Sequence, residues 1–182
     1  CLCLLDENGG FYMEHLCIGD IQKGPRGTNE TMFSEVTNIP YDYLTGCLAE
    51  SWEFLDPTTQ LFHLRQGVMW MDKPGVMAAR EFTAEDCVFA LNRSLLEGPR
   101  AASGKYDAIK SFSAPDKYTF KVEYNEFYAD WGYIVGWGYY SQIYPPEMVE
   151  ADAENWRNAC GTGPFMLTDF VSGAAMTFEK NP

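Results

Sequence analysis

Alternating apolar and polar residues predict a hairpin in the first half of the chain. Over 61–65, Phe62 and Leu64 share one face and the remaining residues share the other, which is the pattern of a half-buried strand. The turn-forming sequence Asp-Pro-Thr-Thr at 56–59 separates this segment from Trp52–Phe54. We therefore predict two antiparallel strands joined by a tight turn.

The same alternation occurs twice more along the chain. Aromatic residues and valine alternate with polar residues over 118–124, which predicts a strand with one apolar face, and the residues at 113–116 are expected to form the turn before it. Near the end, 165–170 and 174–179 flank the Val-Ser-Gly sequence at 171–173. That arrangement is typical of a second hairpin.

One segment has the period of a helix. Thr83 can cap its first turn, Asp86 can return a hydrogen bond to the cap, and Gly98-Pro99 is expected to end it. Shorter helices are expected after Pro145-Pro146 and over 153–159. Apolar residues recur at helical spacing on one face of the main helix: Ala84, Val88, Leu91 and Leu95.

The remaining segments are less regular. Residues 19–40 are rich in Gly, Thr, Asn and Pro and predict an irregular surface excursion, whereas 41–48 are compatible with a short helix or turn. Several strands with separated helices indicate the α+β (mixed α/β) class. A length of 182 residues allows one good core, or about one and a half domains.

The charge of the chain excludes one class of partner. There are 13 basic and 26 acidic residues, so the formal net charge is −13, and the acidic residues are spread along the chain. A phosphate backbone would be repelled, so we predict no nucleic-acid binding. No apolar run approaches the roughly 20 residues that span a bilayer. The chain opens at Cys1 and stops on an apparent strand end, from which we expect a fragment.

The cysteines do not indicate a metal site. They lack the close, regular spacing of zinc ligands, and we interpret them as buried or incidental thiols. Cys1 could be the lipid-bearing first residue of a bacterial lipoprotein, although apolar residues follow it where a polar tether is usual. No metal ion or other cofactor is predicted. The six cysteines are Cys1, Cys3, Cys17, Cys47, Cys87 and Cys160.

Candidate catalytic groups have simpler structural interpretations. His15 and His63 have no motif that would supply a nucleophile, so we interpret both as structural or surface residues. The Gly-Thr-Gly-Pro sequence at 161–164 lacks the lysine of a phosphate loop and predicts a tight reversal into a strand. The acidic pairs at 85–86 and 50–53 are explained by helix capping and by a solvated strand. We predict that the protein is not an enzyme.

The best candidate for ligand binding is an aromatic segment over 131–140, where glycines alternate with Trp and Tyr. Such rings offer large, rigid contact areas with a polar group, but they can equally fill a core against the helix over 84–96. We expect the rings at 131 and 133 in the core. The candidate ligand-binding residues are Trp137, Tyr139 and Tyr140.

Four blocks of sequence, in order, resemble a large family of transport receptors. They are LAESWE at 48–53, FHLRQGVMW at 62–70, the helix start FTAED with its continuation to Arg93, and GTGPF at 161–165 followed by FEKNP at 178–182. The pattern, over roughly 40–182, is similar to the extracellular solute-binding proteins of family 5. A longer loop after Trp70 and Cys87 in place of a usual valine depart from it.

The resemblance implies a periplasmic-binding-protein-like type II fold, of which this chain would hold part of the first lobe. By that resemblance, 1–40 form an irregular and truncated N-terminal part of the first lobe, 41–160 its small extra subdomain, and 161–182 the strands returning to the lobe. The second lobe, which supplies much of the ligand contact in peptide-binding relatives, would lie outside this chain.

The function implied is a non-enzymatic, monomeric, periplasmic or cell-surface receptor. It would deliver a small solute, most simply a peptide, to the permease and ATPase subunits of an ABC importer. Two alternatives remain open at this point. One is a receptor of the same family for oligosaccharides, and the other is an aromatic-rich carbohydrate-active enzyme or glycan-binding module.

Overall fold

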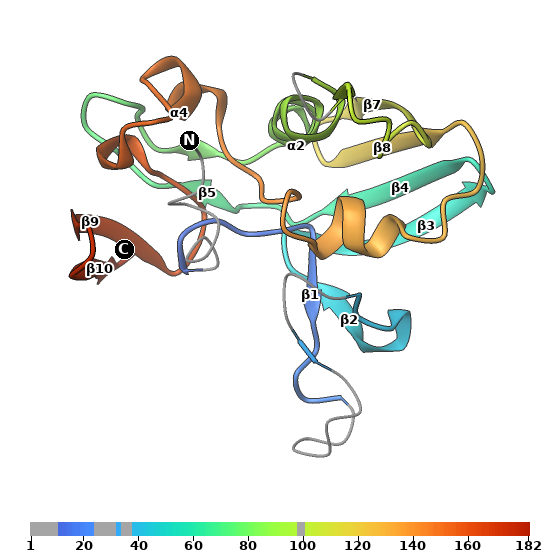
Figure 1. The fold of residues 1–182 in the computed structure, drawn as a ribbon, viewed down its shortest axis with the longest axis horizontal. Helices are drawn as coiled ribbons and strands as arrows, with labels where there is room; N and C mark the ends of the chain where they lie inside the picture. The colour runs from blue at the N-terminus through green and yellow to red at the C-terminus, as the bar shows by residue number, and fades with distance from the viewer. Residues whose placement is uncertain (1–10, 24–31, 34–37, 98–100) are drawn as a thin grey trace.

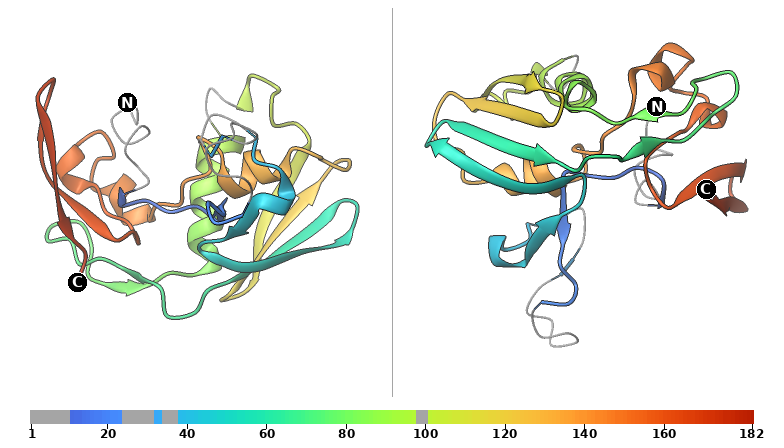
Figure 2. Two further views of the ribbon diagram at one scale, coloured as in Figure 1. Left: turned by 90° about the horizontal axis from the view of Figure 1, so that it is seen from below. Right: turned by 180° about the vertical axis from the view of Figure 1, so that it is seen from behind.

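The computed structural model describes residues 11–23, 32–33, 38–97 and 101–182 (Figure 1). A four-stranded sheet occupies one end of the molecule and a two-stranded hairpin the other (Figure 2). In chain order the elements are β1 (Cys17–Gly19), η2 (Tyr41–Tyr43), β2 (Leu44–Gly46), β3 (Ala49–Asp56), β4 (Thr59–Leu64), β5 (Met69–Trp70), β6 (Arg80–Glu81), α2 (Ala84–Leu91), η3 (Asn92–Leu96), β7 (Ile109–Asp116), β8 (Thr119–Tyr124), η4 (Gly132–Trp137), α4 (Pro146–Glu150), η5 (Trp156–Asn158), β9 (Phe165–Val171) and β10 (Ala175–Lys180).

The main sheet is antiparallel, with strands in the order β3-β4-β8-β7. Its register places Trp52 opposite Phe62 and Phe62 opposite Phe120, so one face carries the large rings. Phe62 and Phe120 are fully buried, whereas His63 and Lys121 on the opposite face are partly exposed. This separation follows from the alternation in the sequence, because neighbouring side chains of a strand point to opposite faces.

Two elements cover the apolar face of this sheet. Helix α2 packs against β7 and β8, as Figure 1 shows. The ring of Trp131, just before η4, contacts Trp52, Phe54 and Phe62, with centroids 5.7–6.0 Å apart, and stacks on Tyr41 at 5.1 Å. The prediction that Trp131 is a core residue is confirmed. Its partners, however, belong to β3, β4 and η2 and not to helix α2, because η4 lies over the other half of the sheet.

Helix α2 begins at the predicted cap. The Thr83 and Asp86 side chains form the reciprocal capping box, and Asp86 also receives a hydrogen bond from Trp70 Nε1 at 3.1 Å. Arg80 pairs with Asp86 at 2.6 Å and with Glu147 of α4 at 2.6 Å. Asp86 is almost fully buried, so this network, which the sequence did not predict, neutralises a buried charge while it links β6, α2 and α4.

Most predicted elements are confirmed. Both hairpins form, and Gly173 adopts φ +73° in the turn between β9 and β10, where glycine carries no steric cost. The helix after Pro145-Pro146 is α4. The predicted end of the main helix at Gly98-Pro99 lies outside the described residues, as does most of the predicted excursion over 19–40.

Three predictions need correction. The residues at 113–116 are not a turn but the end of β7, and the reversal follows at 116–118, where Asp116 accepts a hydrogen bond from Tyr118 N–H at 2.8 Å. A proline at 115 is tolerated there because β7 is an edge strand. The helix expected over 153–159 is only the short η5. The segment 41–48 combines the short helix η2 with the strand β2.

The Gly-Thr-Gly-Pro segment has a role beyond a reversal. A Cβ on Gly161 would lie 1.7 Å from the carbonyl oxygen of Tyr12, and one on Gly163 would lie 2.8 Å from Tyr12 Cα. Gly163 N–H also donates to Tyr12 O at 3.0 Å. The two glycines therefore allow the backbone to approach the segment before β1, which explains their position better than turn geometry alone.

Candidate functional site

The three predicted ligand-binding residues do not form one cluster. Tyr139 and Tyr140 are in an edge-to-face contact, with ring centroids 4.9 Å apart. Trp137 is directed elsewhere, and its ring lies 5.3 Å from the buried ring of His15. All three are half-buried. The structure thus brings two of the predicted residues together and places the third against the segment that precedes β1.

Tyr139 and Tyr140 belong to a larger group of rings, which we call the aromatic wall and define as Tyr106, Tyr133, Tyr139 and Tyr140. These residues line one small cavity together with Leu95, Lys105, Ile134 and Gly138. The cavity holds only about 10 Å³, close to the space of a single water molecule. By itself, this cavity is too small to enclose a solute.

The rings of the aromatic wall come from two different parts of the chain. Tyr106 lies on the connection between η3 and β7, and the other three lie on η4 or just after it. Gly138 allows the chain to leave η4 sharply, because a Cβ there would lie 2.2 Å from the carbonyl oxygen of Tyr133. Sequence analysis missed Tyr106 and Lys105, because neither lies within the aromatic segment that it singled out.

A second hollow lies between β5 and the C-terminal hairpin. This groove has a volume of about 800 Å³, within the range of small-molecule sites. Its lining includes Met69 and Trp70 of β5 and Met166 of β9, together with Glu14 and Thr162. The side chain of Trp70 is fixed by its bond to Asp86. The groove contains none of the predicted ligand-binding residues.

A third hollow, of about 260 Å³, lies at the start of η4 and is lined by Tyr41, Asp130 and Tyr133. The amide nitrogen of Asn38 donates to Asp130 at 2.9 Å. About half of Tyr41 is exposed. Partial loss of solvent around its hydroxyl, followed by the charge of Asp130, raises the pKa of Tyr41.

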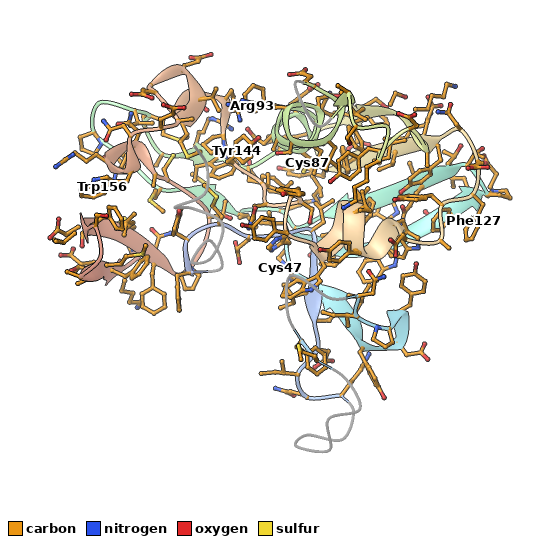
Figure 3. All side chains as sticks on the ribbon, viewed as in Figure 1. Cys47, Cys87, Arg93, Phe127, Tyr144 and Trp156 are labelled. Carbon is orange, nitrogen blue, oxygen red and sulfur yellow. The ribbon has the colours of Figure 1, made fainter. Side chains whose placement is uncertain are left out.

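The surroundings of the histidines and thiols are those of packing or surface residues. Burial lowers the pKa of His15 to about 4, although a hydrogen bond to the Gly138 backbone opposes the shift. His63 lies at the surface, 3.0 Å from Glu53. Burial raises the pKa of the Cys47 thiol to about 12 and that of Cys87 above its usual value. Cys47 lies between β2 and β3, whereas Cys87 lies on α2 (Figure 3). These groups therefore do not resemble a catalytic nucleophile with its base.

Arg93 and Tyr144, labelled in Figure 3 near the C-terminal end of α2, are also structural residues. Arg93 lies beside the Tyr144 ring, with the guanidinium carbon 5.8 Å from its centroid. The Tyr144 hydroxyl lies 2.8 Å from Ser94 Oγ. Within the described residues, no three His, Cys, Asp or Glu side chains group as a metal site would require, and no helix is long and apolar enough to cross a bilayer.

Comparison with known proteins agrees with the resemblance noted in the sequence. The sequence model of the bacterial extracellular solute-binding proteins, family 5 Middle, matches residues 44–182. The matched region begins at β2 and includes all four strands of the main sheet, the aromatic wall and the C-terminal hairpin. The family model therefore matches more than half of the chain, and the matched region includes both the four-stranded sheet and the C-terminal hairpin.

Similar proteins include a curated relative and several solved structures. Heme-binding protein A of Haemophilus influenzae is 28% identical over 149 residues, which are 72% of this chain and 27% of that protein. MoaA of A. tumefaciens R10, solved with mannopinic acid, has a TM-score of 0.72 at 23% identity, covering 97% of this chain and 32% of that chain. DppA of Helicobacter pylori, solved with the peptide STSA, has a TM-score of 0.68 at 22% identity, covering 97% and 34%. This chain thus spans about a third of the length of these relatives.

Proposed function

Because the chain belongs to the bacterial extracellular solute-binding proteins of family 5, we propose that it is part of the peptide receptor of an ABC importer. The family comprises solute-binding proteins and not enzymes, which removes the carbohydrate-active enzyme as an alternative. The receptor would act as a monomer in the periplasm or attached to the cell surface. It would pass its solute to permease and ATPase subunits.

The family match over 44–182 is the observation that carries this proposal. The choice of peptides is supported by the solved relatives, among which DppA was crystallised with the peptide STSA. The aromatic wall is a suitable surface for such a ligand, because tyrosines provide rigid apolar area with hydroxyl groups for hydrogen bonds. We assign the solute contact of this chain to Tyr139 and Tyr140. Trp137 would hold the segment that carries them in place through its contact with His15.

The proposal also gives each part of the chain a place in a two-lobed receptor. Residues 41–160 would form the small extra subdomain of the first lobe, and 161–182 would return to that lobe. Residues 1–40 would be an irregular part of the same lobe. Since the aromatic wall encloses so little space, a second lobe would close over it when the solute binds, as hinge-closing receptors do.

Isothermal titration calorimetry of the full-length receptor, with both lobes present, tests this function. Di- to penta-peptides should bind, whereas oligosaccharides and nickel chelates should not. Hemin belongs in the same series, because the curated relative is named as a heme-binding protein. Absence of binding by every peptide, with a folded protein by circular dichroism, would refute the peptide assignment. Binding of a sugar instead would favour the oligosaccharide receptor of the same family.

A further inference from the structure

We propose that the hollow at the start of η4 is a second binding site, which takes a small organic ammonium ion. We call it the η4 hollow, and its lining is Asn38, Ile39, Pro40, Tyr41, Asp130 and Tyr133. Its volume of about 260 Å³ lies just below the roughly 300 Å³ of the smallest drug-sized pockets, so the ligand must be small. The site does not depend on the function proposed above, because neither tyrosine assigned to solute contact lines it.

Tyrosine rings provide two walls of the η4 hollow. The ring of Tyr41 stacks on Trp131, with centroids 5.1 Å apart and the ring planes inclined by 11°. Tyr41 is still 48% exposed, so its other face remains accessible from the hollow. The approach of this ring to η4 requires Gly132, because a Cβ there would lie 2.8 Å from Tyr41 Cε1. The face of an aromatic ring is negative and attracts cations.

Asp130 adds a negative charge that no basic side chain neutralises. Carboxylates elsewhere in the described part of the chain, such as Glu81 and Glu123, pair with lysines, whereas Asp130 pairs with no basic residue there. The side-chain amide of Asn38 donates to Asp130 Oδ1 at 2.9 Å, which holds the carboxylate without cancelling its charge. Loss of solvent, and then the charge of Asp130, raise the pKa of Tyr41, so the ring and the carboxylate act on the same space.

The other walls decide which ions fit. Ile39 and Pro40 are apolar, and the lining contains one carboxylate, whereas a bare metal ion needs several oxygen ligands. The alkyl groups of an organic ammonium can pack on these walls while its charge lies against the rings and Asp130. An anion would be repelled, since no lining residue is basic and the net charge of the chain is −13.

Choline and its uncharged analogue 3,3-dimethylbutan-1-ol test this site, because the two molecules have nearly the same shape and differ in charge. Their binding to the full-length receptor is measured by ligand-observed NMR titration at low salt. Choline should bind with a Kd of about 1 mM, and the analogue should bind about tenfold more weakly. Equal affinities would mean that the hollow has no preference for cations and would overturn the proposal. Absence of choline binding would do the same.

Variants locate the site on the protein. Asp130→Asn and Tyr41→Leu should each weaken choline binding about tenfold, whereas Tyr41→Phe keeps the ring and should keep the affinity. Glu126→Gln is the matched control, because it removes the same unit of charge from the same connection between β8 and η4 but does not line the hollow. Circular dichroism checks that each variant is folded. If Asp130→Asn binds choline as tightly as Glu126→Gln does, the proposal is refuted.

Competition with a peptide separates this site from the solute site. The choline titration is repeated with the receptor saturated by the tightest-binding peptide of the calorimetric screen. The affinity for choline should not change, since Tyr139 and Tyr140 lie outside the η4 hollow. Displacement of choline by the peptide would place it in the solute site and overturn the proposal. If no peptide binds in the screen, the proposed function fails, while the choline titrations with the variants still decide this inference.

Discussion

His15 should make this protein less stable in acid. The side chain is 2% exposed, and its ring packs on Trp137 with centroids 5.3 Å apart. Its Nε2 is buried and has no hydrogen-bond partner among the residues that the structure describes. Burial therefore favours the neutral ring, and the pKa falls to about 4 from an ordinary value of 6.5. A proton added to the folded protein would place an unpaired charge in the core.

The sign and size of the effect follow from linkage. The unfolded chain binds a proton to His15 below about pH 6.5, and the folded protein does so only near pH 4. The contribution of His15 to stability is therefore constant above pH 7 and falls as the pH drops from 6.5 towards 4. With 1.36 kcal/mol for each pKa unit, the full loss is roughly 3 kcal/mol. By pH 4.5 about 2.5 kcal/mol is lost, a large part of a typical free energy of unfolding.

Urea unfolding followed by circular dichroism measures this loss at pH 7.5, 6.5, 5.5 and 4.5. His15→Gln cannot gain a proton, so its free energy of unfolding should fall less steeply than that of the unmodified protein. Acidic residues also titrate below pH 5, and the difference between the two proteins removes their contribution. His63→Gln, a change at the surface, should retain the full slope. Equal slopes for the unmodified protein and His15→Gln would refute the reasoning.

Further changes test the packing of the fold. Arg80→Ala should lower the free energy of unfolding by roughly 3 kcal/mol in urea titrations, because the buried Asp86 carboxylate would lose its positively charged partner. A change below about 0.5 kcal/mol would contradict the network. Trp131→Ala should cost about 3–5 kcal/mol and lower the thermal midpoint, whereas Phe127→Ala, an exposed ring, should cost far less. Gly161→Ala should reduce the yield of folded protein, because the new Cβ would clash with the Tyr12 backbone. Gly67→Ala is the control, since a Cβ at Gly67 meets open space although its φ is positive. An equal loss of folded protein in both variants would contradict the close approach at Gly161.

Local patterns predicted the elements well wherever a residue and its partner lie close in sequence. The Thr83 cap needs only Asp86, three residues away, and the 56–59 turn needs only Asp56, whose carboxylate accepts from Thr58 N–H at 2.8 Å. Strand β7 was not predicted, because the residues at its end, 113–116, have the composition of a turn. Only their pairing with β8 shows that they form a strand. Its stability comes from tertiary contacts and not from propensity.

The candidate site was only partly accessible to sequence reasoning. Aromatic composition was enough to select Tyr139 and Tyr140, but the same signal selected Trp137, which packs on His15 instead. Nothing in the local sequence indicated that Lys105 lies near these rings, since a lysine in a turn is common. Residues separated by some thirty positions become neighbours only after the chain folds.

By itself the sequence determined the α+β class, the two hairpins, the capped helix and the family, because these depend on short-range periodicity and on motifs of fixed spacing. Tertiary structure decided which half of the sheet Trp131 covers, which buried charge Arg80 neutralises and which rings share a surface. Each of those outcomes depends on contacts between distant segments, and their energies are gained only when water is excluded between them.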